Sequence, residues 1–238
     1  MIKSFGLTDV GVLRHENEDA FLLYPEKNIF VVADGVGGQN KGQLASKLAT
    51  DEIKKYIDKN KDIHNLEEYF LKLLNKIDKK IMDQSLLKVE NKGMATTLIS
   101  CYMENNNFFI VNIGDSRGYL ITDDDMIKIT DDHSYVNELL KAGEITEDEA
   151  RVHPKKNIIT KALGIGENVN PDFYKGELKK NDMILLCSDG LTNEVEDAEI
   201  FKIVKEKTNL KTACISLVKK AKKNGGKDNI TLVLIKEE

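Results

Sequence analysis

The order of strand-like and helix-like segments is the strongest constraint on the fold of this 238-residue chain. Strand-like runs come first, two amphipathic helices follow, and strand-like runs then return in consecutive pairs. The expected strands cover residues 3–8, 20–24, 29–33, 95–104, 107–113, 118–122, 126–129, 172–174, 183–187 and 230–236. The expected helices cover residues 43–59, 65–87, 134–142, 146–152, 197–207 and 212–223. A parallel sheet requires strict alternation of strand and helix, so this order favours an α+β layered fold with antiparallel sheets and helices outside.

The composition excludes several classes of protein. Hydrophobic residues make up 41% of the chain and charged residues 32%, which is typical of a globular protein rather than a disordered one. The net charge of −5 gives no basic surface for nucleic acid or for an anionic membrane. No apolar run approaches the roughly 18 residues of a membrane span, and the N-terminus lacks the pattern of a secretion signal. Cys101, Cys187 and Cys214 lie far apart in apolar stretches, so we expect buried, reduced thiols in a cytoplasmic protein.

Acidic residues recur where strand-like runs end or turns begin. They are Glu18, Asp19, Asp34, Asp115, Asp189 and Asp228. An Asp-Gly pair taken alone is a turn signal. However, strand ends at one edge of a sheet can converge, and clustered carboxylates repel one another unless cations lie between them. Ligation by oxygen alone suits Mg²⁺ or Mn²⁺ and not Zn²⁺, so the pattern indicates a site for such cations.

Arg14 lies four residues before Glu18 and has two interpretations. An arginine beside carboxylates is usually a salt-bridge partner. If cations occupy the carboxylates, the guanidinium is instead free to bind a phosphate with two hydrogen bonds. Two divalent cations and one arginine are typical of a site for phosphoryl chemistry.

Five of six short segments carry all of these acidic residues. The six segments cover residues 8–19, 32–38, 95–98, 112–117, 187–192 and 228–231. Each segment alone is a weak signal, but six in this order are specific and extend over nearly the whole chain. Together they resemble the motifs of the protein phosphatase 2C family, the metal-dependent (PPM-type) serine/threonine phosphatases, and most closely its bacterial branch.

The resemblance implies a four-layer αββα sandwich, in which two antiparallel β-sheets carry helices on both outer faces. It implies one phosphatase domain over residues 1–238, with a flap-like insert at about residues 131–166. The implied reaction is hydrolysis of phosphoserine and phosphothreonine in proteins by a hydroxide that bridges two Mn²⁺ or Mg²⁺ ions. The expected partners are phosphoprotein substrates and a bacterial serine/threonine kinase that the enzyme opposes, and we expect a monomer.

The motif positions also imply a ligand set. Asp34 resembles the carboxylate that bridges the two metal ions, and Gly35 would offer its carbonyl to one of them. Asp189 and Asp228 would complete the other ion's ligands. Glu18 would reach the second ion directly or through water.

Three further residues take roles from the same resemblance. Asp19 would lie behind the ligands and support them. Asp115 matches the aspartate that holds a weaker third ion in bacterial members. Arg14 matches the arginine that binds the substrate phosphate.

The chain departs from the family pattern at two positions. Some members carry a histidine directly after the Asp-Gly pair as a proposed general acid, but this chain has Val36. Protonation of the leaving group would then come from metal-bound water or another side chain. Some members carry an aspartate where this chain has Asn193, which weakens the expectation of a third ion.

Two alternative functions differ from this interpretation. One is a catalytically weak or inactive relative that binds phosphoproteins, although such a protein is expected to have lost Asp34, Asp189 or Asp228, and all three are present. The other is a phosphatase of an anti-sigma-factor antagonist, although those enzymes usually carry a fused sensor domain for which this chain leaves no room. The four histidines, expected to lie at the surface or in hydrogen bonds, are His15, His64, His133 and His153.

Overall fold

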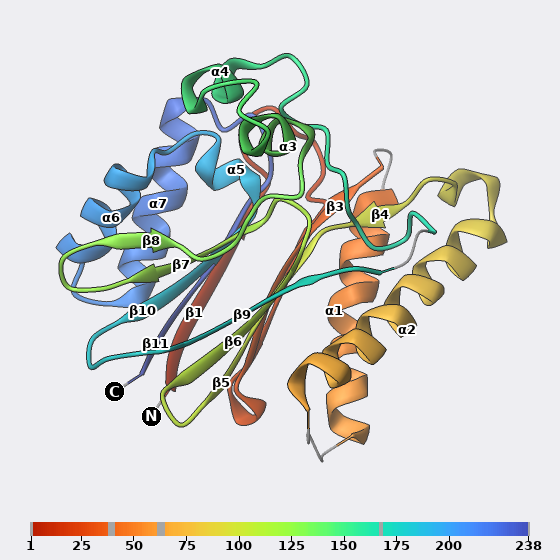
Figure 1. Cartoon of the computed structure of the whole chain (residues 1–238), viewed down its shortest axis with the longest axis horizontal. Coiled ribbons are helices and arrows are strands. Elements are labelled where there is room, and N and C mark those ends of the chain that lie inside the picture. Colours follow the sequence, from red (N-terminus) through yellow and green to blue (C-terminus); the bar gives the residue numbers. More distant parts are fainter. Residues whose placement is uncertain (1, 38–40, 61–64, 167–168, 238) are drawn as a thin grey trace.

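The computed structural model describes residues 2–37, 41–60, 65–166 and 169–237, and it contains two antiparallel β-sheets packed face to face (Figure 1). The first sheet has the order β1 (Ile2–Asp9), β11 (Ile230–Glu237), β10 (Met183–Cys187), β7 (Arg117–Ile121), β8 (Met126–Lys128). The second has the order β2 (Asp19–Tyr24), β3 (Ile29–Val36), β5 (Leu98–Glu104), β6 (Asn107–Ile113), β9 (Asp172–Glu177), and β4 (Ala95–Thr96) pairs with the end of β3. The predicted pair of antiparallel sheets is therefore confirmed.

Helices cover both outer faces of the sandwich. The long helices α1 (Lys41–Lys59) and α2 (Leu66–Leu87) lie on the second sheet, and α6 (Asp197–Glu206) and α7 (Leu210–Asn224) lie on the first (Figure 1). Three short helices, α3 (Tyr135–Lys141), α4 (Glu147–Val152) and α5 (Asp189–Thr192), gather at the end of the sandwich opposite the two termini (Figure 1). This arrangement confirms the four αββα layers. None of the helices in the described part of the chain combines the length and apolarity of a membrane span.

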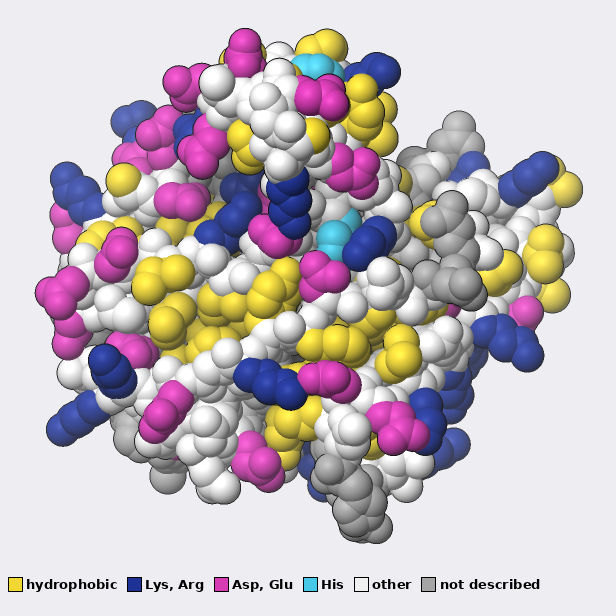
Figure 2. All heavy atoms as spheres, viewed as in Figure 1, with side chains coloured by type: hydrophobic (Ala, Val, Ile, Leu, Met, Phe, Trp, Pro, Cys, Tyr) yellow, Lys and Arg dark blue, Asp and Glu magenta, His cyan; other side chains and the backbone are white. Residues whose placement is uncertain are grey.

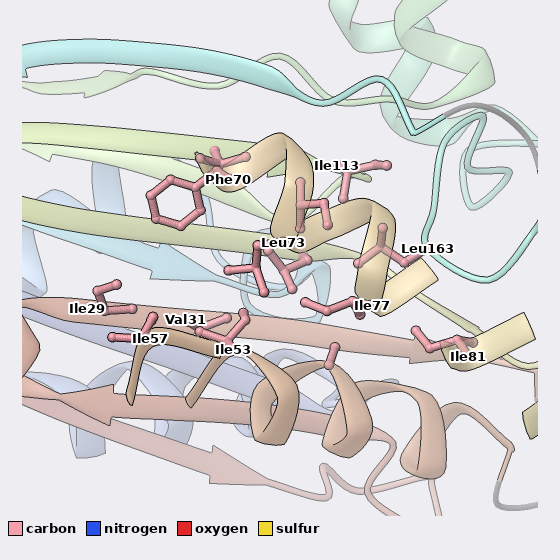
Figure 3. Packing of buried hydrophobic residues seen from close by; sticks show 14 of the residues in the cluster. Ile29, Val31, Ile53, Ile57, Phe70, Leu73, Ile77, Ile81, Ile113 and Leu163 are labelled. Carbon is pink, nitrogen blue, oxygen red and sulfur yellow. The ribbon is translucent and has the colours of Figure 1, made fainter. Parts of the chain in front are cut away.

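The strand β3 is buried on both of its faces, because successive side chains of a strand point to opposite sides. Ile29 and Val31 pack against the helices α1 and α2 (Figure 3), and Phe30 and Val32 pack between the two sheets. All four are fully buried. The end of β3, which carries Asp34, is therefore held by packing from two layers.

Several element boundaries differ from those expected. The strand expected over residues 95–104 is interrupted at Thr97, whose backbone nitrogen leaves the strand pairing and donates to the carbonyl of Asp34 at 2.8 Å. The last helix begins at Leu210 and not at residue 212, because the Asn209 side chain caps it by accepting from the Thr212 backbone nitrogen. The single-turn helix α5 was not predicted, since four residues are too few to show helical periodicity.

Other local predictions are confirmed. Asn105 and Asn106 form the hairpin turn between β5 and β6, and both have positive φ, as tight hairpin turns require. Thr146 and Glu149 form the predicted capping box at the start of α4. The three cysteines are buried and unpaired.

Candidate metal centre

The predicted acidic residues converge at one end of the sandwich, and they come from both sheets. Asp19 begins β2, Asp34 lies near the end of β3, and Asp115 follows β6, so these three belong to the second sheet. Asp189 follows β10 and Asp228 precedes β11, so these two belong to the first. The carboxyl of Asp34 lies close enough to the other four for each of their charges to raise its pKa. The acidic residues therefore converge as expected. They meet where the ends of both sheets lie together, and not along the edge of a single sheet.

The backbone of Asp34 is fixed from three directions. It faces Asp19 in the register of β2 and β3. Its nitrogen donates to Oγ1 of Thr97 at 3.0 Å, and its carbonyl accepts from the Thr97 nitrogen at 2.8 Å and from Oγ1 of Thr96 at 2.9 Å. The two threonines of the 95–98 segment thus hold the backbone that carries the central carboxylate.

Gly35 allows helix α1 to approach the end of β3. A Cβ atom at this position would lie 2.2 Å from the carbonyl oxygen of Gly42 and 2.5 Å from that of Glu18. The Gly35 nitrogen donates to the Glu18 carbonyl at 3.1 Å. Only a glycine fits where the strand, the helix and the Glu18 backbone meet.

Glu18 is tied to α1 and to the segment before β11. Its Oε1 accepts from the backbone nitrogen of Gly42, in the first turn of α1, at 3.1 Å. Its backbone carbonyl accepts from Oγ of Ser46 at 2.6 Å, and its backbone nitrogen donates to Oδ1 of Asn229 at 2.8 Å. The Asn229 side chain also donates to the carbonyls of Val10 and Glu16. Asn229 therefore fixes the loop that carries Arg14 and Glu18.

Four carboxyls of the cluster have pKa values above those of ordinary aspartates. Burial, followed by the charge of Asp19, raises the pKa of Asp34 well above its usual range. Burial raises the pKa of Asp19 to about 7 and that of Asp115 to about 8. It also raises the pKa of Asp189, which accepts a hydrogen bond from Asp34. The Asp34 and Asp189 side chains therefore lie next to each other, at a point where one cation could contact both.

These residues fit hard divalent cations. All the candidate side-chain ligands are carboxylates, which Mg²⁺ and Mn²⁺ prefer. Within the described residues, no three carboxylate, imidazole or thiol groups form a ready cage around one ion. Mg²⁺ commonly keeps several waters and takes only one or two carboxylates from the protein.

Arg14 lies at the rim of the cluster. Its Nη2 donates to Oδ2 of Asp228 at 2.8 Å, and about half of its side chain is exposed. The structure thus contains the salt bridge that the sequence allowed as one interpretation. Binding of phosphate by Arg14 stays a prediction.

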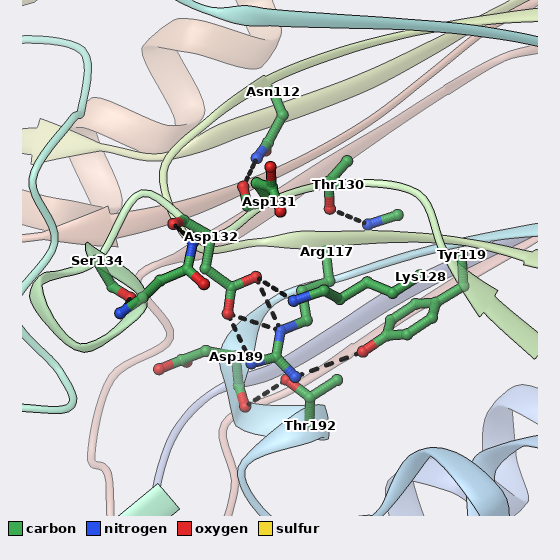
Figure 4. A network of polar contacts seen from close by, with 12 residues as sticks. Asn112, Arg117, Tyr119, Lys128, Thr130, Asp131, Asp132, Ser134, Asp189 and Thr192 are labelled. Atoms are coloured by element: carbon green, nitrogen blue, oxygen red, sulfur yellow. Dashed lines mark hydrogen bonds and ion pairs between the residues drawn. The ribbon is translucent and has the colours of Figure 1, made fainter. Parts of the chain in front are cut away.

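A cavity of about 520 Å³ begins at Asp115 and Asp189 and continues beneath the insert of residues 131–166, which we call the flap. The flap helices α3 and α4 form one wall, and Asn193 lies on the opposite wall. Arg117 joins the start of the flap to β7, because its guanidinium forks onto Asp132 with Nη2–Oδ2 at 2.6 Å (Figure 4). In Figure 2, charged side chains of both signs surround the flap, whereas hydrophobic side chains occupy the middle of the same face.

The histidines lie in different environments. His15 is exposed, and His153 ends α4 and accepts from the Lys155 nitrogen. His133 is buried at the base of the flap. His64, and Gly38 of the 32–38 segment, lie outside the described residues. The supporting roles of Thr97 and Asn229 were not predicted, although both residues stand inside the six segments.

Comparison with known proteins shows the family. The protein phosphatase 2C family matches residues 14–221 of the chain. The serine/threonine phosphatase stp of Listeria innocua is 38% identical over 234 residues, which cover 96% of this chain and 93% of the relative. The crystal structure of the serine/threonine phosphatase Stp1 from Staphylococcus aureus superimposes with a TM-score of 0.94 at 36% identity, covering 100% of this chain and 96% of that one.

The chain therefore belongs to the protein phosphatase 2C family, and it is a serine/threonine phosphatase of the bacterial PPM type. That family is metal-dependent. One similar structure, the catalytic domain of the phosphatase PstP in complex with two manganese ions, has a TM-score of 0.88 and 30% identity, and covers 99% of this chain and 97% of its own.

Proposed function

We propose that this phosphatase hydrolyses phosphoserine and phosphothreonine in proteins at the acidic end of its sandwich, using two Mn²⁺ or Mg²⁺ ions. The observation that supports this proposal is the convergence of five aspartates from both sheets, four of which, Asp19, Asp34, Asp115 and Asp189, have pKa values that burial and mutual repulsion raise. When bound, such cations supply an activated water and neutralise charge on the phosphoryl group.

The ligand assignment follows from where each side chain is held. Asp34 lies among the other four carboxyls, close enough for each of their charges to act on it, so it is suited to serve two ions. With Asp34, the Gly35 carbonyl and Glu18 would hold one ion, and Asp189 and Asp228 would hold the other.

Asp19 and Asp115 have different surroundings. Asp19 accepts from Oγ of Ser188 at 2.8 Å and is buried, which suits a support behind the ligands. Asp115 lines the cavity beneath the flap, which suits a third and weaker ion. On the other side of the cavity, Asn193 donates to Oδ2 of Asp189 at 2.9 Å, so it orients a ligand and does not serve as one.

Arg14 would bind and orient the substrate phosphate. In the structure its guanidinium pairs with Asp228. A cation at Asp228 would compete for that carboxylate and leave the guanidinium able to form two hydrogen bonds with a phosphate. Val36, which follows Gly35 and is 40% exposed, carries no proton to donate to the leaving group. That proton would come from water or another side chain.

We further propose that residues 1–238 act as one PPM-type domain, with the flap as an insert that contacts protein substrates. We also propose that the protein is a monomeric cytoplasmic enzyme and that it opposes a serine/threonine kinase. An inactive phosphoprotein-binding relative is not favoured, because the carboxylates of Asp34, Asp189 and Asp228 are all present and all lie in the cluster.

The test is hydrolysis of a phosphothreonine peptide by purified protein. We expect activity with added Mn²⁺ or Mg²⁺ and none in excess chelator, with recovery when the metal is restored. Asp124→Asn is the matched control for loss of one carboxylate, since Asp124 is exposed at the tip of the β7–β8 hairpin. Full activity in metal-stripped protein would overturn the proposal.

A further inference from the structure

His133 holds the residue that precedes Asp115 by both of its backbone groups. The Gly114 nitrogen donates to Nδ1 of His133 at 3.0 Å. The Gly114 carbonyl accepts from the His133 backbone nitrogen, also at 3.0 Å. The His133 side chain is 7% exposed, so these contacts are shielded from water. One residue at the base of the flap thus fixes the peptide from which the Asp115 side chain starts.

The Gly114 turn has little freedom to adapt. Its φ of +114° lies in the region that favours glycine, and a Cβ there would meet the Cβ of Thr97 at 2.5 Å. The Gly114 carbonyl also accepts from Nδ2 of Asn112, which donates in addition to the carbonyl of Asp131. Thr97 supports Asp34 as well, so the turns that carry Asp34 and Asp115 pack against the same residue.

The hydrogen bonds define which nitrogen of His133 carries the proton. Nδ1 accepts from a backbone N–H, so the proton resides on Nε2, which donates to Oδ2 of Asp172 at 3.1 Å. Asp172 is held in turn by Nζ of Lys161 at 3.4 Å and by the hydroxyl of Tyr174 at 3.3 Å. Burial lowers the pKa of His133, which keeps the ring neutral and able to accept at Nδ1.

His133 also joins the two ends of the flap. The backbone nitrogen of Thr160 donates to the His133 carbonyl at 2.8 Å. Ser134 and Ile159, one residue further into the flap from each side, form an isolated β-bridge. A displacement of the flap base would therefore move His133 and, through its side chain, the Gly114 turn.

We propose that His133 is a positioning residue for Asp115, and that it couples the base of the flap to the site of the weaker third cation. This inference rests on the proposed function, in which Asp115 holds a cation. Groups that orient metal ligands without touching the ion typically change metal affinity or activity by about 10- to 100-fold when they are lost.

Two substitutions of His133 test the roles of its two ring nitrogens separately. In His133→Asn, Oδ1 occupies the place of Nδ1 and can accept from Gly114, but the donor to Asp172 is lost. In His133→Gln, the amide nitrogen occupies the place of Nε2 and can donate to Asp172, but the acceptor for Gly114 is lost. We expect the Gln variant to need about tenfold more Mn²⁺ for half-maximal hydrolysis of a phosphothreonine peptide, with an unchanged KM for the peptide. The Asn variant is expected to restore most of the wild-type Mn²⁺ dependence.

A second measurement needs neither substrate nor metal. Hydrogen exchange of the Gly114 amide should be faster in His133→Gln than in wild type, and close to wild type in His133→Asn. Equal Mn²⁺ dependence in the two variants, or equal Gly114 exchange, would overturn the role of His133. Metal-independent hydrolysis by the wild-type protein would overturn the proposed function as well, and the wild type alone reveals that failure.

Discussion

Asp34→Asn is expected to stabilise the metal-free protein while it abolishes turnover. Asp34 faces Asp19 across the β2–β3 pair. Facing side chains on such a pair start roughly 5 Å apart, and two unit charges at that distance repel by about 3 kcal/mol at an effective dielectric constant of about 20. Asparagine keeps the volume of aspartate and removes the charge. For a chain of this size about 1 kcal/mol shifts Tm by about 2–4 °C, so full relief of the repulsion corresponds to roughly 6–12 °C.

The gain should depend on pH with a defined sign. Burial and the charge of Asp19 raise the pKa of folded Asp34 well above its unfolded value. A group with a raised pKa contributes stability below its unfolded pKa and loses that contribution as pH rises through the folded pKa. The charge that Asp19 gains as pH rises through its own pKa of about 7 adds to the repulsion. The advantage of Asp34→Asn should therefore be small below the unfolded pKa of an aspartate, roughly 4, and grow as pH rises above it.

Calorimetric unfolding in chelator at an acidic and an alkaline pH measures this effect. Exposed Asp124→Asn serves as the control for removing one charge far from the cluster. With Mn²⁺ at about 1,000 times its Kd the order should reverse, because the ion then stabilises the wild type by about 4.1 kcal/mol, more than the repulsion of about 3 kcal/mol, and stabilises the variant far less. If Asp34→Asn unfolds no higher than wild type at alkaline pH in chelator, the repulsion argument is wrong. Near-normal turnover in this variant would remove the role of Asp34 as the shared ligand.

Three further predictions concern the rim, the flap and the approach of α1. Arg14→Ala should raise the KM for a phosphopeptide by about 10- to 100-fold with little change in calorimetric Mn²⁺ affinity, and a collapse of Mn²⁺ binding would instead make Arg14 a structural partner of Asp228. Removing the outer flap, residues 143–156, should impair phosphoprotein turnover and spare a small aryl phosphate, and equal loss on both substrates would mean that the flap supports the fold. Gly35→Ala should lower the free energy of unfolding by about 1–3 kcal/mol, because the new Cβ lies 2.2 Å from the Gly42 carbonyl oxygen, and chemical denaturation would reveal an unchanged value if α1 can move away.

Local sequence signals were sufficient for most elements of the fold. The apolar run before Asp34 predicts a buried strand, and β3 is buried on both faces because layers lie on either side of it. The apolar stripe of α2 predicts its length, and Asn65 caps its first turn. These features depend on neighbours within a few residues, so the sequence displays them directly.

The spatial relation between distant strand ends has no such local signal. Asp189 and Asp228 come from one sheet and Asp34 from the other, and their meeting depends on how the two sheets stack. The resemblance to the phosphatase family predicted that these aspartates meet, whereas hydrophobic periodicity cannot predict contacts between distant strand ends. A threonine or a histidine can have many roles, so the sequence alone does not show what Thr97 and His133 do. The structure shows that Thr97 holds the backbone of Asp34 and that His133 holds the backbone of Gly114.

The hydrogen bonds around the cluster explain how the fold positions carboxylates without neutralising them. Neutral donors hold the buried carboxylates, since Ser188 donates to Asp19, Asn193 donates to Asp189 and the Thr97 nitrogen donates to the Asp34 carbonyl, whereas Arg14 pairs with Asp228 only at the exposed rim. Arg117, which lies beside Asp189 (Figure 4), is committed to Asp132. A lysine or arginine placed among the carboxylates would satisfy their charge and remove the reason for a divalent ion to bind. Packing of β3 and α1 thus keeps like charges together, and metal binding is the step that relieves their repulsion.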